Sequence, residues 1–454
     1  MIPLSFKETA RAAGSVSALE GKFDTICTDT RKITAGCLFI ALKGENFDGN
    51  EFAADAVRNG ALCAVVDRDC GIGERQIIVD DTKRALLKIA GYYKSLFDIK
   101  TVGVTGSVGK TSTKEMIYTV LSSKYKTLKN EGNLNNEIGV PLTLFNLEKS
   151  HRAAVIEMGM NHFGEISGIT QAVKPDIAVI SNIGVSHIEN LGSREGILKA
   201  KLEILEGMSD KSPLILNGDD DMLSKANTGE HPVIYYGIEN SACAFRAQEI
   251  TSTDVETVFT CCFKGGAVKA CLPFTGRHNI YNALSAAAAG YLTGISPEES
   301  FEALKEYKTT GMRQRIVKKY GMTFIEDCYN ASPDSQAAAM SVLGNMNCAR
   351  RIAVTGDMLE LGSYSRTAHE AVGGYAAENG IDILFTYGEN SVFTADKAEE
   401  KGVRDVRRFD TKPELTAALA ETLKEGDAVL FKASRGMKLE DVINGLYEIL
   451  EKRG

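Results

Sequence analysis

Short apolar runs alternate with stretches of helical periodicity along most of the chain. The runs Ala153–Ile156 and Ile177–Ile180 are continuous in apolar residues, which predicts buried strands. The segment Thr82–Phe97 repeats its apolar residues at helical spacing and predicts an amphipathic helix. Because strands and helices follow one another in this way, we expect an α/β fold built on parallel sheets that helices cover on both faces.

The pattern changes at two places and divides the chain into three predicted domains. Residues 1–98 mix short apolar runs with glycine and aspartate turns, which predicts a mixed α/β domain. Residues 99–311 carry the regular strand–helix rhythm, and β-rich sequence at residues 241–275 interrupts it, which predicts an antiparallel insertion. Residues 312–454 predict a second, Rossmann-like doubly wound domain. Strands are expected at Thr25–Cys27, Gly36–Leu42, Cys63–Val66, Gln76–Val79, Phe324–Ile325, Ile352–Val354, Ile383–Phe385 and Ala428–Phe431.

A glycine-rich turn joins the first strand of the middle domain to a helix. Thr101–Val104 favours a strand and Lys114–Leu121 has a helical pattern, although Val104 stands where the common motif has its first glycine. In such a turn backbone N–H groups converge on phosphate oxygens, Lys110 would reach the outer phosphates and the Thr111 hydroxyl would bind Mg²⁺. A simple strand-to-helix turn is the alternative reading. The context favours a site for ATP or GTP formed by Thr105, Gly106, Ser107, Val108, Gly109, Lys110, Thr111 and Ser112.

Composition narrows the classes of protein that fit. The 454 residues are 44% hydrophobic and 25% charged, as in globular proteins of several domains. A net charge of -8 and the lack of long basic runs argue against nucleic-acid binding. The sequence contains neither a signal-peptide pattern nor an apolar segment of membrane-spanning length, so we expect a cytoplasmic protein without membrane insertion. The ten cysteines are scattered, which fits thiols in a reducing compartment better than disulfides or a zinc site.

Polar residues at strand ends and in one helix are candidates for a site around the phosphate loop. Glu157 directly follows the strand Ala153–Ile156, where a carboxylate is able to hold Mg²⁺. His187 follows a second strand end, where a lone histidine is usually structural and less often a metal ligand. Lys201 alone reads as a surface lysine, and Asn135 and Asn136 alone indicate only a turn.

Taken in order, these motifs resemble the Mur ligases. This family comprises ATP-dependent enzymes that form the amide bonds of the peptide stem in the bacterial cell-wall precursor. The resemblance spans nearly the whole chain and rests on Gly106–Thr111, Asn133–Pro141, Glu157–Met160, Asn182–His187, Lys199–Glu203 and Gly276–Asn282. Two further motifs, Asp327–Ser335 and Thr355–Gly362, resemble the last-acting member of the family. The Asp-Asn-Pro-Arg run typical of the member that adds the third residue does not occur in the sequence.

The resemblance implies a reaction and its substrates. ATP would convert the carboxylate of UDP-N-acetylmuramoyl-tripeptide into an acyl phosphate, which the amine of D-alanyl-D-alanine then attacks. Two Mg²⁺ sites are implied, one at Thr111 and Glu157, the other at His187 and a carbamylated Lys201. Lys199 is the alternative to Lys201. No nucleic-acid partner is implied, and a monomer is expected.

The resemblance also assigns residues to the two ends of the substrates. Asn279 and Asn282 would face the adenine, with Arg313 and Asp327 at the ribose, and Arg315 competes with Arg313. The residues implied in binding the other substrates are Thr30, Arg31, Asn46, Asp48, Asn135, Asn136, Lys432, Ser434 and Arg435. The family more often has serine at the position of Thr30 and histidine at the position of Asn50. A solvated basic turn is the alternative for the last three residues, and His369 is as easily structural as functional.

Three other functions remain open at this stage. One is a sibling ligase that adds a different amino acid, and another is a folylpolyglutamate synthetase, which shares the central loop but usually lacks the N-terminal uridine-binding domain. The third is a nucleotide-switched binding protein. The sequence does not distinguish lysine from diaminopimelate as the third residue of the tripeptide.

Overall fold

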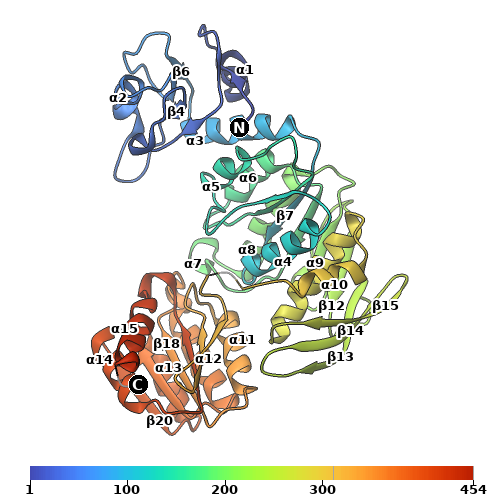
Figure 1. Ribbon diagram of the computed structural model, residues 1–454, viewed down its shortest axis with the longest axis vertical. Coiled ribbons are helices and arrows are strands. Elements are labelled where there is room, and N and C mark those ends of the chain that lie inside the picture. The colour runs from blue at the N-terminus through green and yellow to red at the C-terminus, as the bar shows by residue number, and fades with distance from the viewer. Residues whose placement is uncertain (310, 453–454) are drawn as a thin grey trace.

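The computed structural model describes residues 1–309 and 311–452, and three α/β units follow one another along its long axis (Figure 1). Each unit has its own sheet, and the proposed boundaries at residues 98/99 and 311/312 fall in the connections between sheets. The four-stranded sheet belongs to the first unit, the nine-stranded sheet to the second and the six-stranded sheet to the third. The predicted α/β class with parallel sheets is confirmed.

The N-terminal unit is built on a small parallel sheet of order β3-β4-β5-β6. All four residues of the strand predicted at Cys63–Val66 are buried, and their apolar character on both faces explains why the prediction holds to the residue. The elements of this unit are β1 Leu4–Ser5, α1 Phe6–Ala13, β2 Lys22–Phe23, β3 Ile26–Cys27, β4 Leu38–Ile40, α2 Ala53–Arg58, β5 Cys63–Val66, β6 Gln76–Ile78 and α3 Thr82–Ser95.

The central unit contains a nine-stranded sheet of order β15-β14-β13-β12-β11-β10-β7-β9-β8. Alternate residues of β9 enter opposite cores, Ala154 and Ile156 on one face and Ala153 and Val155 on the other. The elements are β7 Lys100–Thr105, α4 Lys110–Ser122, β8 Thr127–Lys129, α5 Gly139–Leu144, β9 Ala153–Glu157, α6 Glu165–Val173, β10 Ile177–Ile180, α7 Ile188–Leu191, α8 Arg194–Leu202, β11 Leu214–Asn217, β12 Val233–Gly237, β13 Phe245–Ser252, β14 Thr257–Phe263, β15 Gly266–Leu272, α9 Arg277–Leu292 and α10 Pro297–Leu304.

The β-rich segment at residues 241–275 forms the antiparallel strands β13, β14 and β15, as predicted. It does not stand apart from the central sheet, however, because β13 pairs with β12 in parallel. The segment therefore adds three strands to one edge of the sheet, and Figure 1 shows these strands beside α9 and α10.

The C-terminal unit is doubly wound, with order β16-β17-β21-β18-β19-β20 and only the edge strand β16 antiparallel. The sequence analysis missed two of these strands, the edge strands β16 and β20. The elements are β16 Arg315–Lys319, β17 Met322–Glu326, α11 Pro333–Gly344, β18 Arg350–Gly356, α12 Ser365–Glu378, β19 Ile383–Tyr387, α13 Ser391–Glu400, β20 Asp405–Phe409, α14 Lys412–Thr422, β21 Asp427–Lys432 and α15 Glu440–Glu451.

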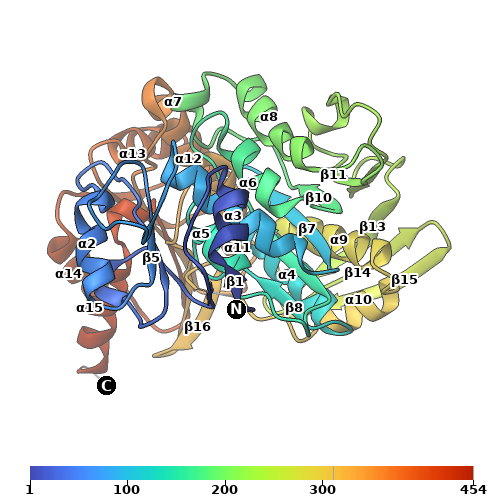
Figure 2. The ribbon, with the colours of Figure 1, turned by 90° about the horizontal axis from the view of Figure 1, so that it is seen from above.

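Helix α3 connects the first two units and packs against α5 and α6 of the central unit (Figures 1 and 2). The Tyr93 hydroxyl donates to the Leu147 carbonyl (2.8 Å) and accepts from the Ile2 N–H (2.9 Å). Buried residues of both units form one continuous apolar cluster around this helix. Across the described ranges, no helix combines the length and apolar character needed to cross a membrane.

Candidate active site

The glycine-rich turn connects β7 to α4 and lies over the end of β10. Gly106 has a φ of 150°, and a Cβ there would collide with Ser181 Oγ, so only glycine fits. Gly109 has a φ of 80° and stands directly before α4. The Val108 N–H donates to Asn182 Oδ1 (2.9 Å), and Ser181 Oγ donates to the Val108 carbonyl (2.7 Å). These contacts hold the turn in the shape that a phosphate needs at a helix N-terminus.

Two lysine side chains converge on the Gly106 carbonyl from different helices. Lys110 Nζ and Lys201 Nζ each lie 2.9 Å from this oxygen. Burial and, secondarily, the charge of Lys110 lower the pKa of Lys201 well below its ordinary value. Lys199, the alternative on the same helix, is exposed and lies over the ring of Phe163. Helix α8 thus turns Lys201 toward the phosphate loop and Lys199 toward the surface.

Thr111 and Glu157 meet below the loop. The Thr111 hydroxyl donates to Glu157 Oε2 (2.8 Å), and Asn135 Nδ2 donates to Glu157 Oε1 (2.8 Å). A hydroxyl and a carboxylate are oxygen ligands of the kind Mg²⁺ prefers, and Mg²⁺ commonly takes one or two protein ligands together with phosphate oxygens. Within the described ranges, no cluster of three or more His, Cys, Asp or Glu residues is arranged to hold a metal. The pair therefore fits a Mg²⁺ ion that a nucleotide brings with it.

His187 lies opposite a carboxylate of the C-terminal unit. Its Nδ1 is 2.9 Å from Glu360 Oε2, and the interaction lowers the pKa of Glu360. Both residues have positive φ angles, 62° and 63°, which for residues other than glycine are uncommon. His187 thus links the loop after β10 to the turn that follows β18.

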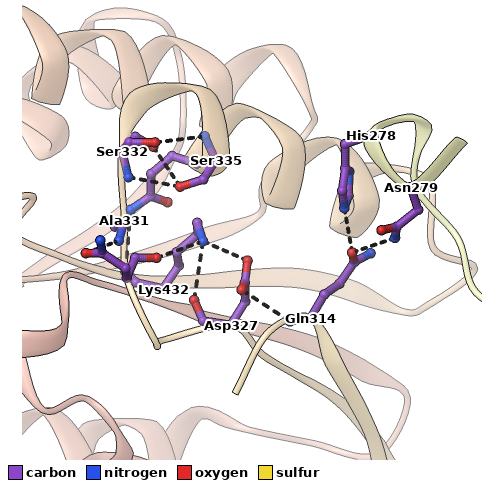
Figure 3. Close-up of polar contacts among 10 residues, drawn as sticks. His278, Asn279, Gln314, Asp327, Ala331, Ser332, Ser335 and Lys432 are labelled. Carbon is purple, nitrogen blue, oxygen red and sulfur yellow. Dashed lines mark hydrogen bonds and ion pairs between the residues drawn. The ribbon is translucent and has the colours of Figure 1, made fainter. Parts of the chain in front are cut away.

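The two asparagines predicted at the adenine lie at the start of α9. Asn279 Nδ2 donates to Gln314 Oε1 (3.0 Å), which also contacts His278 Nε2 (2.7 Å) (Figure 3). Asn282 Oδ1 accepts from the Thr113 hydroxyl (3.1 Å) of α4. The asparagines therefore stand between the phosphate loop and the connection to the C-terminal unit.

Of the two arginines that compete for the ribose, Arg313 is the one that lines the cavity described below. Its guanidinium lies 3.9 Å from the ring centroid of Tyr329. Arg315 lies on β16 and instead pairs with Glu326 Oε2 (3.2 Å) of the neighbouring strand. The geometry supports Arg313 for this role.

Lys432 ends β21, Ser434 and Arg435 follow it, and all three contact other protein groups. Lys432 is 2% exposed, and its Nζ lies 2.7 Å from Asp327 Oδ2 (Figure 3). Ser434 Oγ accepts from a backbone N–H of the turn after β18 (2.9 Å). Arg435 Nη1 lies 2.7 Å from Glu440 Oε1. Burial thus contradicts the alternative of a solvated basic turn for Lys432 and Ser434, whereas the Arg435 side chain is exposed.

A cavity of about 600 Å³ lies between the central and C-terminal units, a size typical of small-molecule sites. It brings together most of the predicted site residues, namely Ser107, Val108, Gly109, Lys110, Thr111, Ser112, Asn135, Asn136, Glu157, His187, Asn279, Asn282, Arg313, Asp327, Lys432, Ser434 and Arg435. Lys201 lies behind the loop, against the Gly106 carbonyl. The turn that begins at Thr105 therefore lies between the Lys201 side chain and the cavity.

The predicted uridine-nucleotide residues lie in the N-terminal unit. Arg31 is exposed and pairs with Asp29 (2.8 Å) next to Thr30. Asn46 is exposed as well. The Asp48 carboxylate accepts from Asn50 Nδ2 (2.7 Å) and from an arginine, contacts that lower its pKa to about 2. The structure thus separates the predicted uridine segment from the nucleotide loop.

Several residues of the site were missed by the sequence analysis. His278 and Gln314 meet beside Asn279, and Glu360 meets His187. Asp334 lines the cavity with a carboxylate that faces the backbone of the opposite unit, and burial raises its pKa. The Asn130 side chain accepts a hydrogen bond from the Glu157 N–H (2.9 Å). All of them lie inside or beside motifs that the sequence singled out, but only the fold shows what each faces.

His369 has a structural position. Its Nε2 accepts from the Met358 N–H (3.0 Å), its Nδ1 lies 2.8 Å from the Ser365 carbonyl, and burial lowers its pKa. A neutral ring with Nδ1 protonated satisfies both contacts. His369 therefore supports the turn after β18 from behind.

The fold and the site define an α/β enzyme that uses a nucleoside triphosphate. Residues 104–290 match the family model of the Mur ligase middle domain, residues 312–435 that of the Mur ligase glutamate ligase domain, and residues 22–93 that of the Mur ligase catalytic domain. The chain belongs to the Mur ligase family.

Similar proteins point to one branch of this family. A protein of Bacillus subtilis (strain 168) is 40% identical over 93% of both chains, and one of Escherichia coli (strain K12) is 37% identical over 96% of both. Each is named UDP-N-acetylmuramoyl-tripeptide–D-alanyl-D-alanine ligase. A crystal structure of MurF from Acinetobacter baumannii matches with a TM-score of 0.90 and 32% identity, covering 98% of this chain and 99% of that one.

Two further solved structures show a similar fold at lower sequence identity. MurF from Thermotoga maritima in complex with ADP matches with a TM-score of 0.87 and 28% identity, over 95% of this chain and 98% of that one. A folylpolyglutamate synthase from Mycobacterium tuberculosis shares the fold alone, with a TM-score of 0.61 and 14% identity over 81% of this chain and 94% of that one.

Proposed function

We propose that this chain joins D-alanyl-D-alanine to UDP-N-acetylmuramoyl-tripeptide and converts ATP to ADP and phosphate as it does so. The product is the pentapeptide precursor of peptidoglycan. One observation carries the proposal: a phosphate loop with its Thr111–Glu157 pair opens into a cavity that the C-terminal unit closes from the other side. The relatives of this name, 40% and 37% identical over nearly the whole chain, support the choice of substrates.

The reaction needs an activated acid, because a carboxylate does not react with an amine in water. The γ-phosphoryl group of ATP passes to the tripeptide carboxylate, and ADP leaves. The amine of the dipeptide then attacks the carbonyl carbon of the acyl phosphate, loses a proton, and the tetrahedral intermediate expels inorganic phosphate. Negative charge builds on phosphoryl oxygens, which the Lys110 ammonium and the N-terminus of α4 would stabilise.

Thr111 and Glu157 would hold one Mg²⁺, which neutralises charge on the phosphates when it is bound. We assign a second site to His187 and to Lys201 in its carbamylated form. The lowered pKa of Lys201 favours the neutral amine, which is the form that adds CO₂ and releases a proton. The resulting carbamate is an oxygen ligand where the unmodified lysine would repel a cation.

We assign the substrate ends as follows. Asn279 and Asn282 face the adenine, with Arg313 and Asp327 at the ribose. Thr30, Arg31, Asn46 and Asp48 bind the uridine nucleotide, and the C-terminal segment Lys432–Arg435 faces the dipeptide or the phosphate. The positions of the central and C-terminal groups around one cavity support these roles.

An assay of ADP formation with defined substrates tests the proposal. The protein is incubated with ATP, Mg²⁺, UDP-N-acetylmuramoyl-tripeptide and either D-alanyl-D-alanine or single amino acids. We expect ADP only when the muramyl peptide and the dipeptide are both present, and ¹⁸O from the labelled tripeptide carboxylate in the released phosphate. ADP release with a single amino acid would indicate a sibling ligase, and release without any amine would indicate a nucleotide switch.

Replacing Thr111 with alanine is expected to raise the Mg²⁺ concentration for half-maximal activity by about 10-fold or more, because one oxygen ligand is lost. A Mg²⁺ titration at saturating ATP measures the shift. Thr119→Ala is the matched control, since it removes a hydroxyl of the same helix that donates only to the Glu115 carbonyl. If both variants titrate like the parent protein, Thr111 is not a metal ligand.

A further inference from the structure

Lys114 is a fully buried lysine, 0% exposed, one helical turn after the phosphate-loop lysine Lys110. Its Nζ donates to the Asn130 carbonyl (2.6 Å) and lies 2.9 Å from Glu115 Oε1. A buried ammonium costs free energy unless charged and hydrogen-bonding partners surround it. Glu115 supplies the charged partner of this ammonium, and the Asn130 carbonyl accepts its hydrogen bond.

That carbonyl belongs to the residue that fixes Glu157. Asn130 follows β8 directly, at the point where the pairing of β8 with β9 ends. From there its side chain, instead of its backbone, makes the hydrogen bonds to the end of β9. Its Oδ1 accepts from the Glu157 N–H (2.9 Å), while its Nδ2 donates to the Glu157 carbonyl (3.0 Å). Asn130 is 1% exposed and Glu157 2% exposed. The Asn130 amide thus forms hydrogen bonds with both the N–H and the carbonyl of Glu157.

The charges around Lys114 are arranged in a short chain. Glu115 Oε2 lies 2.6 Å from Lys129 Nζ, so one carboxylate serves two lysines. Lys129 also lies over the ring of Tyr118, at 4.5 Å from its centroid. Lys129 contacts Glu115 as Lys114 does, but it is Lys114 whose ammonium contacts the Asn130 carbonyl.

We propose that Lys114 is a positioning residue which, through Asn130, holds the Glu157 carboxylate beside Thr111 for the metal that accompanies ATP. The contacts run in series from the Lys114 ammonium to the Asn130 backbone, and from the Asn130 side chain to both sides of Glu157. The inference rests on the proposed function, because it assigns Glu157 to the metal. Lys114 itself touches neither substrate nor metal.

Metal binding in the full-length protein tests this inference, with Mn²⁺ as a paramagnetic probe in the presence of ADP. For Lys114→Met we expect the dissociation constant of Mn²⁺ to rise about 10–100-fold, as for other losses of groups that support metal ligands. The half-saturating Mg²⁺ concentration should rise with it, while the KM for the muramyl peptide stays unchanged. Lys114→Arg, which keeps a cation, should recover part of the affinity.

Lys129→Met is the matched control, because it removes the other cation of Glu115 and leaves in place the contact of the Lys114 ammonium with the Asn130 carbonyl. It should leave Mn²⁺ binding within about twofold of the parent protein. Equal Mn²⁺ affinities for Lys114→Met and Lys129→Met would overturn the proposal and leave Lys114 a structural residue. If Lys114→Met does not fold, Asn130→Ala replaces it, and unchanged Mn²⁺ binding in that variant would overturn the proposal equally.

A Glu157→Gln variant separates this inference from the proposed function. If Glu157→Gln weakens Mn²⁺ binding and Lys114→Met does not, only the role of Lys114 is wrong. If Glu157→Gln itself leaves Mn²⁺ binding unchanged, the metal site of the proposed function is wrong, and the role of Lys114 falls with it.

Discussion

Replacing Lys201 with alanine is expected to lower turnover by about 10³-fold, the upper range for losing one preorganised electrostatic group. Lys201 is buried against the Gly106 carbonyl, and its lowered pKa suits an amine that takes up CO₂. Alanine removes both the amine and the space-filling chain that would carry the carbamate. Initial rates of ADP formation at saturating substrates measure the loss.

The same variant offers a test of the carbamate. Acetate or formate at millimolar concentration is expected to restore part of the turnover of Lys201→Ala, because a small carboxylate enters the vacated space. Lys199→Ala is the control, since Lys199 lies at the surface over Phe163, and its turnover should be unchanged. Loss of turnover in Lys201→Ala without rescue by either acid would mean that the lysine acts through its own ammonium.

The second large effect is expected at Lys110. Lys110→Met should lower kcat by about 10²–10³-fold, because its ammonium faces the phosphate loop where charge develops during phosphoryl transfer. The KM for the muramyl peptide should stay within about twofold, since the predicted uridine residues lie in another unit. Steady-state kinetics in both substrates separate the two constants.

Lys126→Met is the control for charge alone. Lys126 is an exposed lysine of the same unit that pairs with Glu148 (2.6 Å), and its loss should leave kcat unchanged. A Lys110→Met protein that keeps kcat within about tenfold of the parent would show that the loop backbone, rather than the ammonium, carries the stabilisation.

The strands that could be predicted from the sequence are those buried on both faces, because such strands are apolar at every position. The strands Cys63–Val66 and Ile177–Ile180 are apolar throughout and were predicted with their observed bounds. Strand β20, Asp405–Phe409, was missed because it is an edge strand rich in charge. Its Arg408 pairs with Glu399 of α13 (2.8 Å), a contact that no local pattern announces.

The residues of the site also fall into two groups, those that a local sequence motif predicts and those that depend on contacts between distant parts of the chain. The phosphate loop is local, so ten neighbouring residues suffice to predict it. Lys199 and Lys201 are two positions apart on a helix, hence about 200° apart around its axis, and only the packing of α8 decides which one faces the loop. The sequence analysis did not single out Asn130, because its partner Glu157 is 27 residues away in the chain. Contacts of this kind depend on the register of β8 against β9.

Helix α3 has a consequence for how the molecule moves. It merges the apolar interiors of the first two units, whereas within the described residues the two interiors of the third unit draw only on residues from 312 onward. Contacts across the second joint include polar ones such as His278 to Gln314 and Asn347 to Asp254. Two domains joined by a polar interface move relative to each other more readily than two domains that share an apolar core. We therefore expect relative motion at the joint between the central and C-terminal units, and none at α3, where the first two units share one apolar interior.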